Sequence, residues 1–321
     1  EVPRATLPLS GRVTDDVTGA PLQGTRVRLE PAGLTTTTAA DGTYTFPALE
    51  QGRYTVSAGD TRRCGKSASA DIDLTGERVD LRLAYPTDEF GNTCQDETRA
   101  FIRAANRLPL TGIDQFTRID LDFDVTLYGE KYREAWIDTN GLMTFQQMLI
   151  SGWGHWSIPY PSEPGAANAA IYPFWHDWIV DEEASVRTAT IDNGDNDRFV
   201  VEWRNVPSYY DPNARVSFEI LIEEATGDIV VTWADIDDTI PEEKGSIGTV
   251  GIEDANGTEA LTYTFADPIL ANGDAVRFRP GPPPAGPVVS TITGVVTCAG
   301  TPLAGVPVVA GNLATTTAAD G

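Results

Sequence analysis

An internal repeat limits what this chain can fold into more than any other feature of its sequence. Three blocks near the N-terminus return in the same order near the C-terminus: 10–14 with 293–297, 20–24 with 301–305, and 36–42 with 315–321. A repeat of this kind marks a structural unit that is used more than once. Because the second copy stops at an Asp-Gly turn, we expect it to lack at least three strands, to pack poorly after about residue 288, and to belong to a longer protein.

The first copy, residues 1–88, has the pattern of a β-sandwich. Short runs alternate between apolar and polar residues, with turn residues between them: 9–14, 27–29, 44–46, 54–58 and 79–83. A period of two gives each strand one apolar and one solvated face. Asp41 and Gly42 are predicted to form a hairpin turn, because glycine tolerates positive φ.

The middle region, residues 89–279, continues the pattern in longer strands. Residues 119–127 alternate without a break, which places five apolar side chains on one face and Asp120, Asp122, Asp124 and a threonine on the other. Further strands are expected at 136–139, 143–146, 189–192, 199–204, 216–223, 229–233, 249–252, 261–265 and 275–279, with turns at 140–141, 193–194, 227–228 and 256–257. About ten strands at this spacing predict a larger β-sandwich or jelly roll. We expect one short helix, at 98–105.

A proline-rich segment follows the middle region. Residues 280–287 contain five prolines and two glycines and predict a semi-rigid linker over 280–289. The truncated second copy then occupies 290–321. The fold class is therefore all-β: a small sandwich, a larger sandwich or jelly roll, and an incomplete third β domain.

The charge of the chain excludes one class of partner. A net charge of −24 repels the phosphate backbone of nucleic acids. No run of about 18 apolar residues is present to span a membrane. We expect Glu1 to be the start of a mature or excised fragment, so the missing signal peptide does not argue against secretion.

Two of the three cysteines are expected to form a disulfide. Cys64 and Cys94 lie in polar, glycine-containing loops. A disulfide that closes the chain segment between them stabilises a fold by roughly 3–4 kcal/mol in the chain-entropy model. Cys298 would then pair with a residue beyond residue 321. Three buried free thiols are the alternative.

Residues 9–84 resemble the carboxypeptidase regulatory-like family. They carry its pattern G-x-V-x-D, G-x-P-L-x-G, T-x-x-D-G-x-Y-x-F and G-x-Y-x-V nearly complete. The resemblance implies a seven- or eight-stranded sandwich of the transthyretin-like or starch-binding-like kind. It implies a non-catalytic appendage of a secreted enzyme or surface protein, with no catalytic residues.

The middle region resembles extracellular domains of the nidogen type. The resemblance rests on Phe123 and on the blocks 127–129, 136–145, 168–175, 199–203 and 227–229. Similar blocks occur beside subtilisin-like peptidase domains of secreted proteins. The resemblance implies an extracellular adhesive or accessory domain.

No residue set predicts catalysis. Only His155 and His176 are available as the base of a Ser-His-Asp triad, and no G-x-S-x-G segment is present. With 47 acidic residues, a glycosidase-like carboxylate pair carries no information without geometry. We predict no catalytic residues and no enzyme activity for this segment, while its parent protein remains open as a secreted hydrolase.

Calcium is the one candidate cofactor. Asp192, Asp195 and Asp197 lie with two asparagines in one oxygen-rich loop, and calcium prefers six to eight oxygen ligands. A polar hairpin turn is the favoured interpretation of this loop. A solvated strand face is likewise favoured over a cation site for the aspartates of 119–127.

Aromatic residues mark the candidate ligand surface. Trp153, Trp156 and Tyr160 lie in a segment broken by glycine and proline. Trp178 is a further candidate ligand residue, and the nearby aromatic residues are Trp175, Tyr209 and Tyr210. Exposed tryptophan and tyrosine stack on sugar rings or anchor protein partners. The alternative is that they fill loops over the core.

Two functional hypotheses follow from these patterns. The first is a non-catalytic extracellular interaction or spacer module of a larger secreted or cell-surface protein, with further domains in the same chain. The alternative is a carbohydrate-binding, starch-binding-like or accessory region of a secreted hydrolase such as an amylase or a subtilisin-like peptidase. The partner is accordingly a protein or a polysaccharide.

Overall fold

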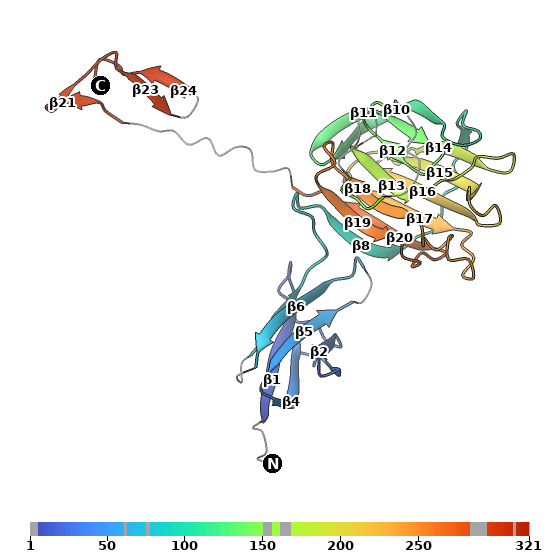
Figure 1. Cartoon of the computed structure of the whole chain (residues 1–321), viewed down its shortest axis with the longest axis horizontal. Coiled ribbons are helices and arrows are strands. Elements are labelled where there is room, and N and C mark those ends of the chain that lie inside the picture. The colour runs from blue at the N-terminus through green and yellow to red at the C-terminus, as the bar shows by residue number, and fades with distance from the viewer. Residues whose placement is uncertain are drawn as a thin grey trace. The chain divides into compact units, whose positions relative to one another are not determined.

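The computed structural model describes residues 6–60, 63–74, 78–149, 156–160, 168–282, 294–310 and 313–320. The regular secondary structure in these residues consists of β-strands alone, so the all-β prediction is confirmed (Figure 1). The chain divides into two compact units, residues 1–283 and 284–321. Among the described ranges, no helix has the length and apolarity that crossing a bilayer requires.

The N-terminal sandwich consists of two sheets whose strands are antiparallel except for the parallel pair β1 and β7. One has the order β4-β1-β7 and the other β3-β2-β5-β6. The strands are β1 (Thr6–Asp15), β2 (Arg26–Glu30), β3 (Leu34–Thr37), β4 (Thr43–Glu50), β5 (Arg53–Gly59), β6 (Ser67–Asp73) and β7 (Leu81–Leu83). Buried and exposed residues alternate along β1, β2 and β4, as the period of two predicts. The inward residues, among them Leu9, Val27, Phe46 and Val56, form one core between the sheets.

The turn at Asp41 and Gly42 is not the predicted hairpin. Gly42 has a φ of 79°, as expected for an Asp-Gly turn. The strands on either side belong to different sheets, because β3 pairs with β2 whereas β4 pairs with β1. A turn residue fixes only the local backbone, and the sheet that β4 joins is decided by where Tyr44 and Phe46 become buried.

The middle domain is a larger sandwich of two sheets. A six-stranded sheet has the order β10-β11-β12-β13-β18-β19, and a seven-stranded sheet has the order β8-β20-β17-β16-β15-β14-β9. Their strands are β8 (Thr93–Thr98), β9 (Asn106–Arg107), β10 (Phe116–Leu127), β11 (Glu130–Asp138), β12 (Met143–Thr144), β13 (Ala170–Trp175), β14 (Ser185–Ile191), β15 (Arg198–Pro207), β16 (Arg215–Glu223), β17 (Ile229–Ala234), β18 (Thr249–Glu253), β19 (Ala260–Phe265) and β20 (Asp274–Arg279). Four of the predicted turns, at 140–141, 193–194, 227–228 and 256–257, connect antiparallel neighbours.

The core of this sandwich contains the largest buried side chains of the chain. Trp203, Phe218 and Trp233 are fully buried between the sheets, and the indole of Trp203 stacks on the ring of Phe218. On β10, Leu121 and Phe123 are buried in this core, while the aspartates that alternate with them, Asp120, Asp122 and Asp124, are exposed. The interpretation of residues 119–127 as a strand with one wet face is confirmed.

The segment after β8 is not the predicted helix. Residues 99–105 have no regular structure and lie against the seven-stranded sheet. The backbone N–H of Ile102 donates to Glu219 at 2.9 Å, and that of Ala104 donates to Glu202 at 2.7 Å. These bonds to carboxylates on β15 and β16 replace the local bonds of a helix, which is why propensity alone mispredicted the segment.

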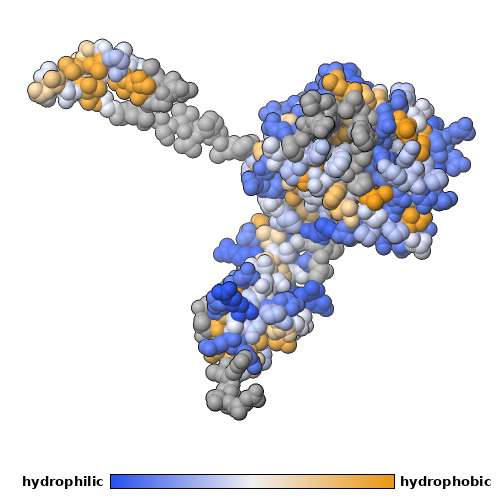
Figure 2. Space-filling model, in the orientation of Figure 1, coloured by the Kyte–Doolittle hydropathy of each residue, from blue (hydrophilic) through white to orange (hydrophobic). Residues whose placement is uncertain are grey.

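The second unit, residues 284–321, contains only two-stranded pairings in its described part. β21 (Thr297–Cys298) pairs with β22 (Thr301–Pro302), and β23 (Pro307–Ala310) pairs with β24 (Leu313–Thr316). Val308 is 37% exposed, whereas Val27, its counterpart in the repeat, is fully buried. Apolar residues cover much of the visible face of this unit (Figure 2).

Candidate functional site

Four loops of the middle domain meet at one end of its sandwich, which we call the pocket end: 108–115, 139–142, 176–184 and 208–214. Backbone hydrogen bonds join them in a chain. Gly112 donates to Val180 at 2.8 Å, Thr139 to Gln115 at 2.8 Å, His176 to Asn140 at 3.0 Å and Tyr209 to Asp177 at 2.8 Å. Loops held by a rigid sandwich in this way are common sites of binding.

A small hollow opens at the pocket end. Its volume is about 190 Å³, and it is lined by Ile113, Asp114, Asn140, Asp177, Trp178 and Tyr209. Typical small-molecule sites measure roughly 300–1,000 Å³. The hollow therefore fits a single side chain or a ligand of that size.

Two acidic residues, Asp114 and Asp177, line this hollow, and neighbours orient the carboxylates of both. Asn140 Nδ2 donates to Asp114 at 2.9 Å, and the Tyr210 hydroxyl donates to Asp177 at 2.6 Å. The hydrogen bond to Asp177 raises the pKa of Tyr210. Asp114 has a φ of 52°, in the left-handed region where aspartate and asparagine are among the better tolerated residues.

A polar cluster lies beneath the hollow. His176 and Ser208 are fully buried, with 3.0 Å between His176 Nε2 and Ser208 Oγ. Ser208 Oγ donates to Glu242 at 2.7 Å and accepts the N–H of Tyr210 at 3.1 Å. His176 Nε2 also lies 3.4 Å from Glu242 Oε1, so the three side chains form a triangle in which both the serine and the histidine approach the carboxylate. This cluster fixes the loops that carry it.

Trp178 does not belong to an exposed aromatic surface, and its assignment as a ligand residue stays a prediction. Its side chain is fully buried, its indole N–H donates to the carbonyl of Phe174 at 2.8 Å, and its ring packs edge-on against the Phe174 ring. Its ring therefore has no exposed face of the kind that stacks on a sugar ring. Trp178 forms the floor of the hollow.

Trp156 and Tyr160 do present an aromatic surface. Trp156 is 51% exposed, and its ring stacks on that of Tyr160 with 5.7 Å between centroids and 11° between planes. Ile158 between them is buried against Trp136, Tyr172 and other residues on the outer face of the six-stranded sheet. Trp153, the other predicted ligand residue of this segment, lies outside the described residues.

Buried polar contacts hold the Trp156–Tyr160 segment in place. The carboxylate of Glu253 accepts the N–H of Tyr160 and the hydroxyl of Tyr172, the latter at 2.6 Å. Burial raises the pKa of Glu253. Thr249 Oγ1 also donates to the carbonyl of Trp156 at 2.7 Å. The exposed pair therefore stands on an ordered base.

The oxygen-rich loop at 192–197 is a turn between β14 and β15. Asp192 accepts the N–H of Gly194 at 3.1 Å, and Asp197 accepts that of Asn193 at 3.0 Å, while Asp195 is exposed. In the described ranges, no three acidic, histidine or cysteine side chains are arranged to hold a metal ion. Calcium binding by Asp192, Asp195 and Asp197 stays a prediction.

The aspartates of β10 are paired within the protein. Asp120 bonds Arg118 at 2.7 Å, Asp122 accepts the hydroxyl of Thr190 at 2.6 Å, and Asp124 bonds Arg133. The Arg133 hydrogen bond lowers the pKa of Asp124. These contacts support the interpretation of this row as a solvated strand face.

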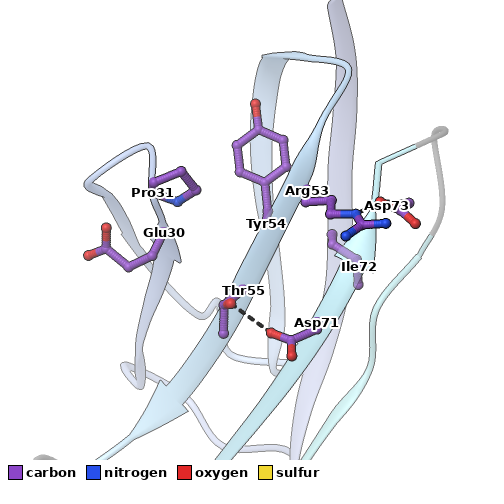
Figure 3. Close-up of a pocket in the computed structure, with 8 residues that line it drawn as sticks. All are labelled: Glu30, Pro31, Arg53, Tyr54, Thr55, Asp71, Ile72 and Asp73. Atoms are coloured by element: carbon purple, nitrogen blue, oxygen red, sulfur yellow. Dashed lines mark hydrogen bonds and ion pairs between the residues drawn. The ribbon is translucent and has the colours of Figure 1, made fainter.

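The N-terminal sandwich carries a wider and more open hollow of about 590 Å³ (Figure 3). It is lined by Glu30, Pro31, Arg53, Tyr54, Thr55, Asp71, Ile72 and Asp73. Three of its four charged side chains have partners, because Thr55 donates to Asp71 at 2.7 Å and Arg53 donates to Asp73 at 3.1 Å. Exposed ion pairs of this kind contribute roughly 0–1 kcal/mol.

The predicted disulfide is confirmed, and it joins the two domains of the first unit. Cys64 follows β5 of the N-terminal sandwich and Cys94 lies on β8 of the middle domain, with 5.2 Å between their Cα atoms. Both are buried at 1% exposure. Asp96 accepts the N–H of Cys64 at 2.8 Å and the hydroxyl of Tyr263 at 3.0 Å. Cys298 is exposed and forms no disulfide with the other described cysteines.

The pocket end was missed as a site by sequence reasoning. Tyr209 and Tyr210 were noted as aromatics, but Asp114, Asn140 and Asp177 come from separate loops. The only local signal was the adjacent tyrosine pair directly after a strand.

Both resemblances seen in the sequence are confirmed by comparison with protein families. The fold defines a disulfide-linked pair of β-sandwich domains, of a kind found in extracellular or regulatory modules. Residues 92–280, more than half of the chain, match the NIDO related family, and the chain belongs to that family. Residues 8–84 match the carboxypeptidase regulatory-like domain. A search of the curated proteins found none that matches the chain.

Proposed function

We propose that this chain is a non-catalytic extracellular module that binds a partner and spaces it from neighbouring domains. The observation that carries the proposal is the buried Cys64–Cys94 disulfide between the two sandwiches. Disulfides persist in oxidising, extracytoplasmic compartments and are rare in the cytosol of mesophiles. A cross-link between domains also limits their relative motion, which suits a spacer.

Two measurements test this function. Mass spectrometry of the protein from its native source is expected to find Cys64 and Cys94 disulfide-bonded in the secreted fraction. Small-angle scattering is expected to show a larger radius of gyration for the Cys64→Ser, Cys94→Ser double variant than for the wild type, with Cys298→Ser as the matched control. Reduced cysteines in a cytosolic fraction would contradict the extracellular assignment, and an unchanged radius of gyration would contradict the spacer role.

Carbohydrate binding is a second candidate, favoured by the exposed Trp156–Tyr160 stack. Trp156 in this stacked pair is 51% exposed, and exposed indole rings bind sugar rings. Affinity electrophoresis in starch and other polysaccharide gels tests it. Trp156→Ala is expected to abolish retardation, whereas Tyr209→Ala, which removes an exposed aromatic at the pocket end, is expected to retain it. Equal migration of all three proteins with and without polysaccharide would reject this candidate.

A further inference from the structure

The hollow at the pocket end combines negative charge with an apolar rim. We propose that it binds a basic side chain, lysine or arginine, presented by a partner protein. The proposal rests on the interaction function proposed above and names the chemistry of the partner.

The size of the hollow selects a single side chain. Its volume of about 190 Å³ lies below the range of roughly 300–1,000 Å³ that is usual for small-molecule sites. A protein partner supplies the remaining contact area around such a hollow, because the binding energy of interfaces concentrates in a few anchor residues seated in pockets.

Charge selects a cation. The lining residues include Asp114 and Asp177 and, among those described there, neither lysine nor arginine. The neighbouring Arg215 is held by two bonds to Asp181, at 2.8 and 2.9 Å, and so does not neutralise the hollow. The net charge of −24 adds long-range attraction for a basic partner.

Apolar side chains around the hollow suit the stem of a lysine or the plane of an arginine. Ile113 is 42% exposed, Tyr209 56% and Tyr210 63%. The rings of Tyr209 and Tyr210 are nearly perpendicular, at 87°. Tyrosine faces attract guanidinium and ammonium groups by about 0.5–2 kcal/mol, depending on desolvation.

The binding groups are fixed before a ligand arrives. The 2.9 Å bond from Asn140 orients Asp114, and the 2.6 Å bond from Tyr210 orients Asp177. Ser208 accepts the N–H of Tyr210 from below, which holds the tyrosine pair. Preorganised groups lose little entropy on binding.

Calcium and sugars fit this hollow less well. Calcium prefers six to eight oxygen ligands, whereas the polar lining consists of Asp114, Asn140, Asp177 and the Tyr209 hydroxyl. A neutral sugar can form hydrogen bonds with the two carboxylates, but it gains no attraction from their charge. A cation is attracted by both.

Nuclear magnetic resonance titration of the full chain tests the proposal. The probes are Nα-acetyl-arginine amide and Nα-acetyl-lysine amide, with the uncharged Nα-acetyl-citrulline amide as the control. The basic probes are expected to shift the amide signals of Tyr209 and Tyr210 and the indole signal of Trp178. Raising the salt concentration from 50 to 500 mM is expected to weaken binding several-fold, since charge drives it.

Matched variants locate the binding. Asp114→Asn keeps a residue that tolerates the φ of 52°, and Asp177→Asn keeps an acceptor for Tyr210. Each is expected to weaken binding about tenfold, which corresponds to about 1.4 kcal/mol. Asp195→Asn makes the same charge change beyond the other end of the ten-residue strand β15, roughly 30 Å away, and is expected to have no effect.

Three results would overturn the proposal: equal shifts with the citrulline probe, no shifts with either basic probe, or binding that survives both aspartate substitutions. Shifts of these same signals by glucose or by calcium chloride, and not by the basic probes, would reassign the hollow to a sugar or a metal ion. The spacer function is decided separately by scattering, so its failure and the failure of this proposal are distinguishable.

Discussion

Replacing Glu219 with glutamine is expected to stabilise the middle domain at neutral pH. Glu219 is fully buried on β16, on the face of the seven-stranded sheet that segment 99–105 covers. Its Oε2 accepts the N–H of Ile102 at 2.9 Å. Within the described residues, neither its Oε1 nor the Oγ1 of Thr232, directly opposite on β17, has a hydrogen-bond partner.

Burial makes the ionised form of this carboxyl unfavourable. It raises the pKa of Glu219 from the ordinary value of 4.5 to about 8, and the nearby charge of Glu202 acts in the same direction. The folded protein therefore keeps the proton up to a pH of about 8, whereas the unfolded chain loses it near 4.5. Because folding at neutral pH requires uptake of a proton, the contribution of Glu219 to stability falls as the pH rises from 4.5 to 8.

The size of the effect follows from the two pKa values. Each tenfold difference in proton affinity corresponds to about 1.4 kcal/mol, so protonation of Glu219 costs at most about 3 kcal/mol at pH 7. Glutamine is neutral at every pH. It keeps an acceptor for Ile102, and its amide N–H faces Thr232. The free energy of unfolding should rise by about 2–3 kcal/mol at pH 7 and change little at pH 4.

Urea unfolding followed by tryptophan fluorescence measures this change. All seven tryptophans lie between residues 136 and 233, so the signal reports the middle domain alone. With a slope of about 3 kcal/mol per molar urea, the midpoint should rise by about 1 M at pH 7. Subtracting the wild-type curve at each pH removes the contribution of other carboxylates.

Glu202→Gln is the matched control and should have the opposite effect. Glu202 is fully buried beside Glu219, but Arg103, Arg204 and the N–H of Ala104 all donate to it. Removing its charge weakens both ion pairs. Because Arg103 is 51% exposed and also lies 3.5 Å from Asp235, the cost should stay below the roughly 3–5 kcal/mol of breaking a fully buried pair. A Glu219→Gln protein that is destabilised at pH 7, or as pH-dependent as the wild type, would refute the reasoning about burial.

Three further substitutions test other parts of the fold. Gly141→Ala should lower the free energy of unfolding by about 3 kcal/mol or more, since its φ is 78° and the new Cβ would lie 2.3 Å from the carbonyl oxygen of Phe174; an unchanged urea midpoint would contradict that close approach. The Cys64→Ser, Cys94→Ser double variant should lose about 3–4 kcal/mol relative to the oxidised wild type and become insensitive to reductant in the same assay. Leu9→Ala should destabilise the N-terminal sandwich by about 2–5 kcal/mol, seen by circular dichroism but absent from the tryptophan transition, and a matching shift in fluorescence would mean that the two domains unfold together.

Local patterns predicted the strands well because strand formation depends on which side chains face the core. At residues 119–127, the side chains that the alternation places on the apolar face are the ones that β10 turns toward the core. The prediction failed where a tertiary contact replaced a local one. Segment 99–105 has helical propensity, yet Glu202 and Glu219, about a hundred residues later in the chain, take its N–H groups.

The ligand surface shows the same division. The sequence identified an aromatic segment, and Trp156 and Tyr160 are indeed exposed and stacked. It had no means of separating them from Trp178, which differs only in being enclosed by the sandwich. Burial is a property of the whole packing, whereas aromaticity is a property of the residue.

The sequence by itself determined that this chain is all-β and that blocks of its first domain recur at the other end, and it favoured the Cys64–Cys94 disulfide that the structure contains. These features depend on local alternation and on loop composition. Only the tertiary structure decided that the Asp41–Gly42 turn passes between sheets and that four separate loops assemble an acidic hollow. Contacts between residues far apart in the chain are set by how two sheets bury their apolar faces together, and no local pattern records that choice.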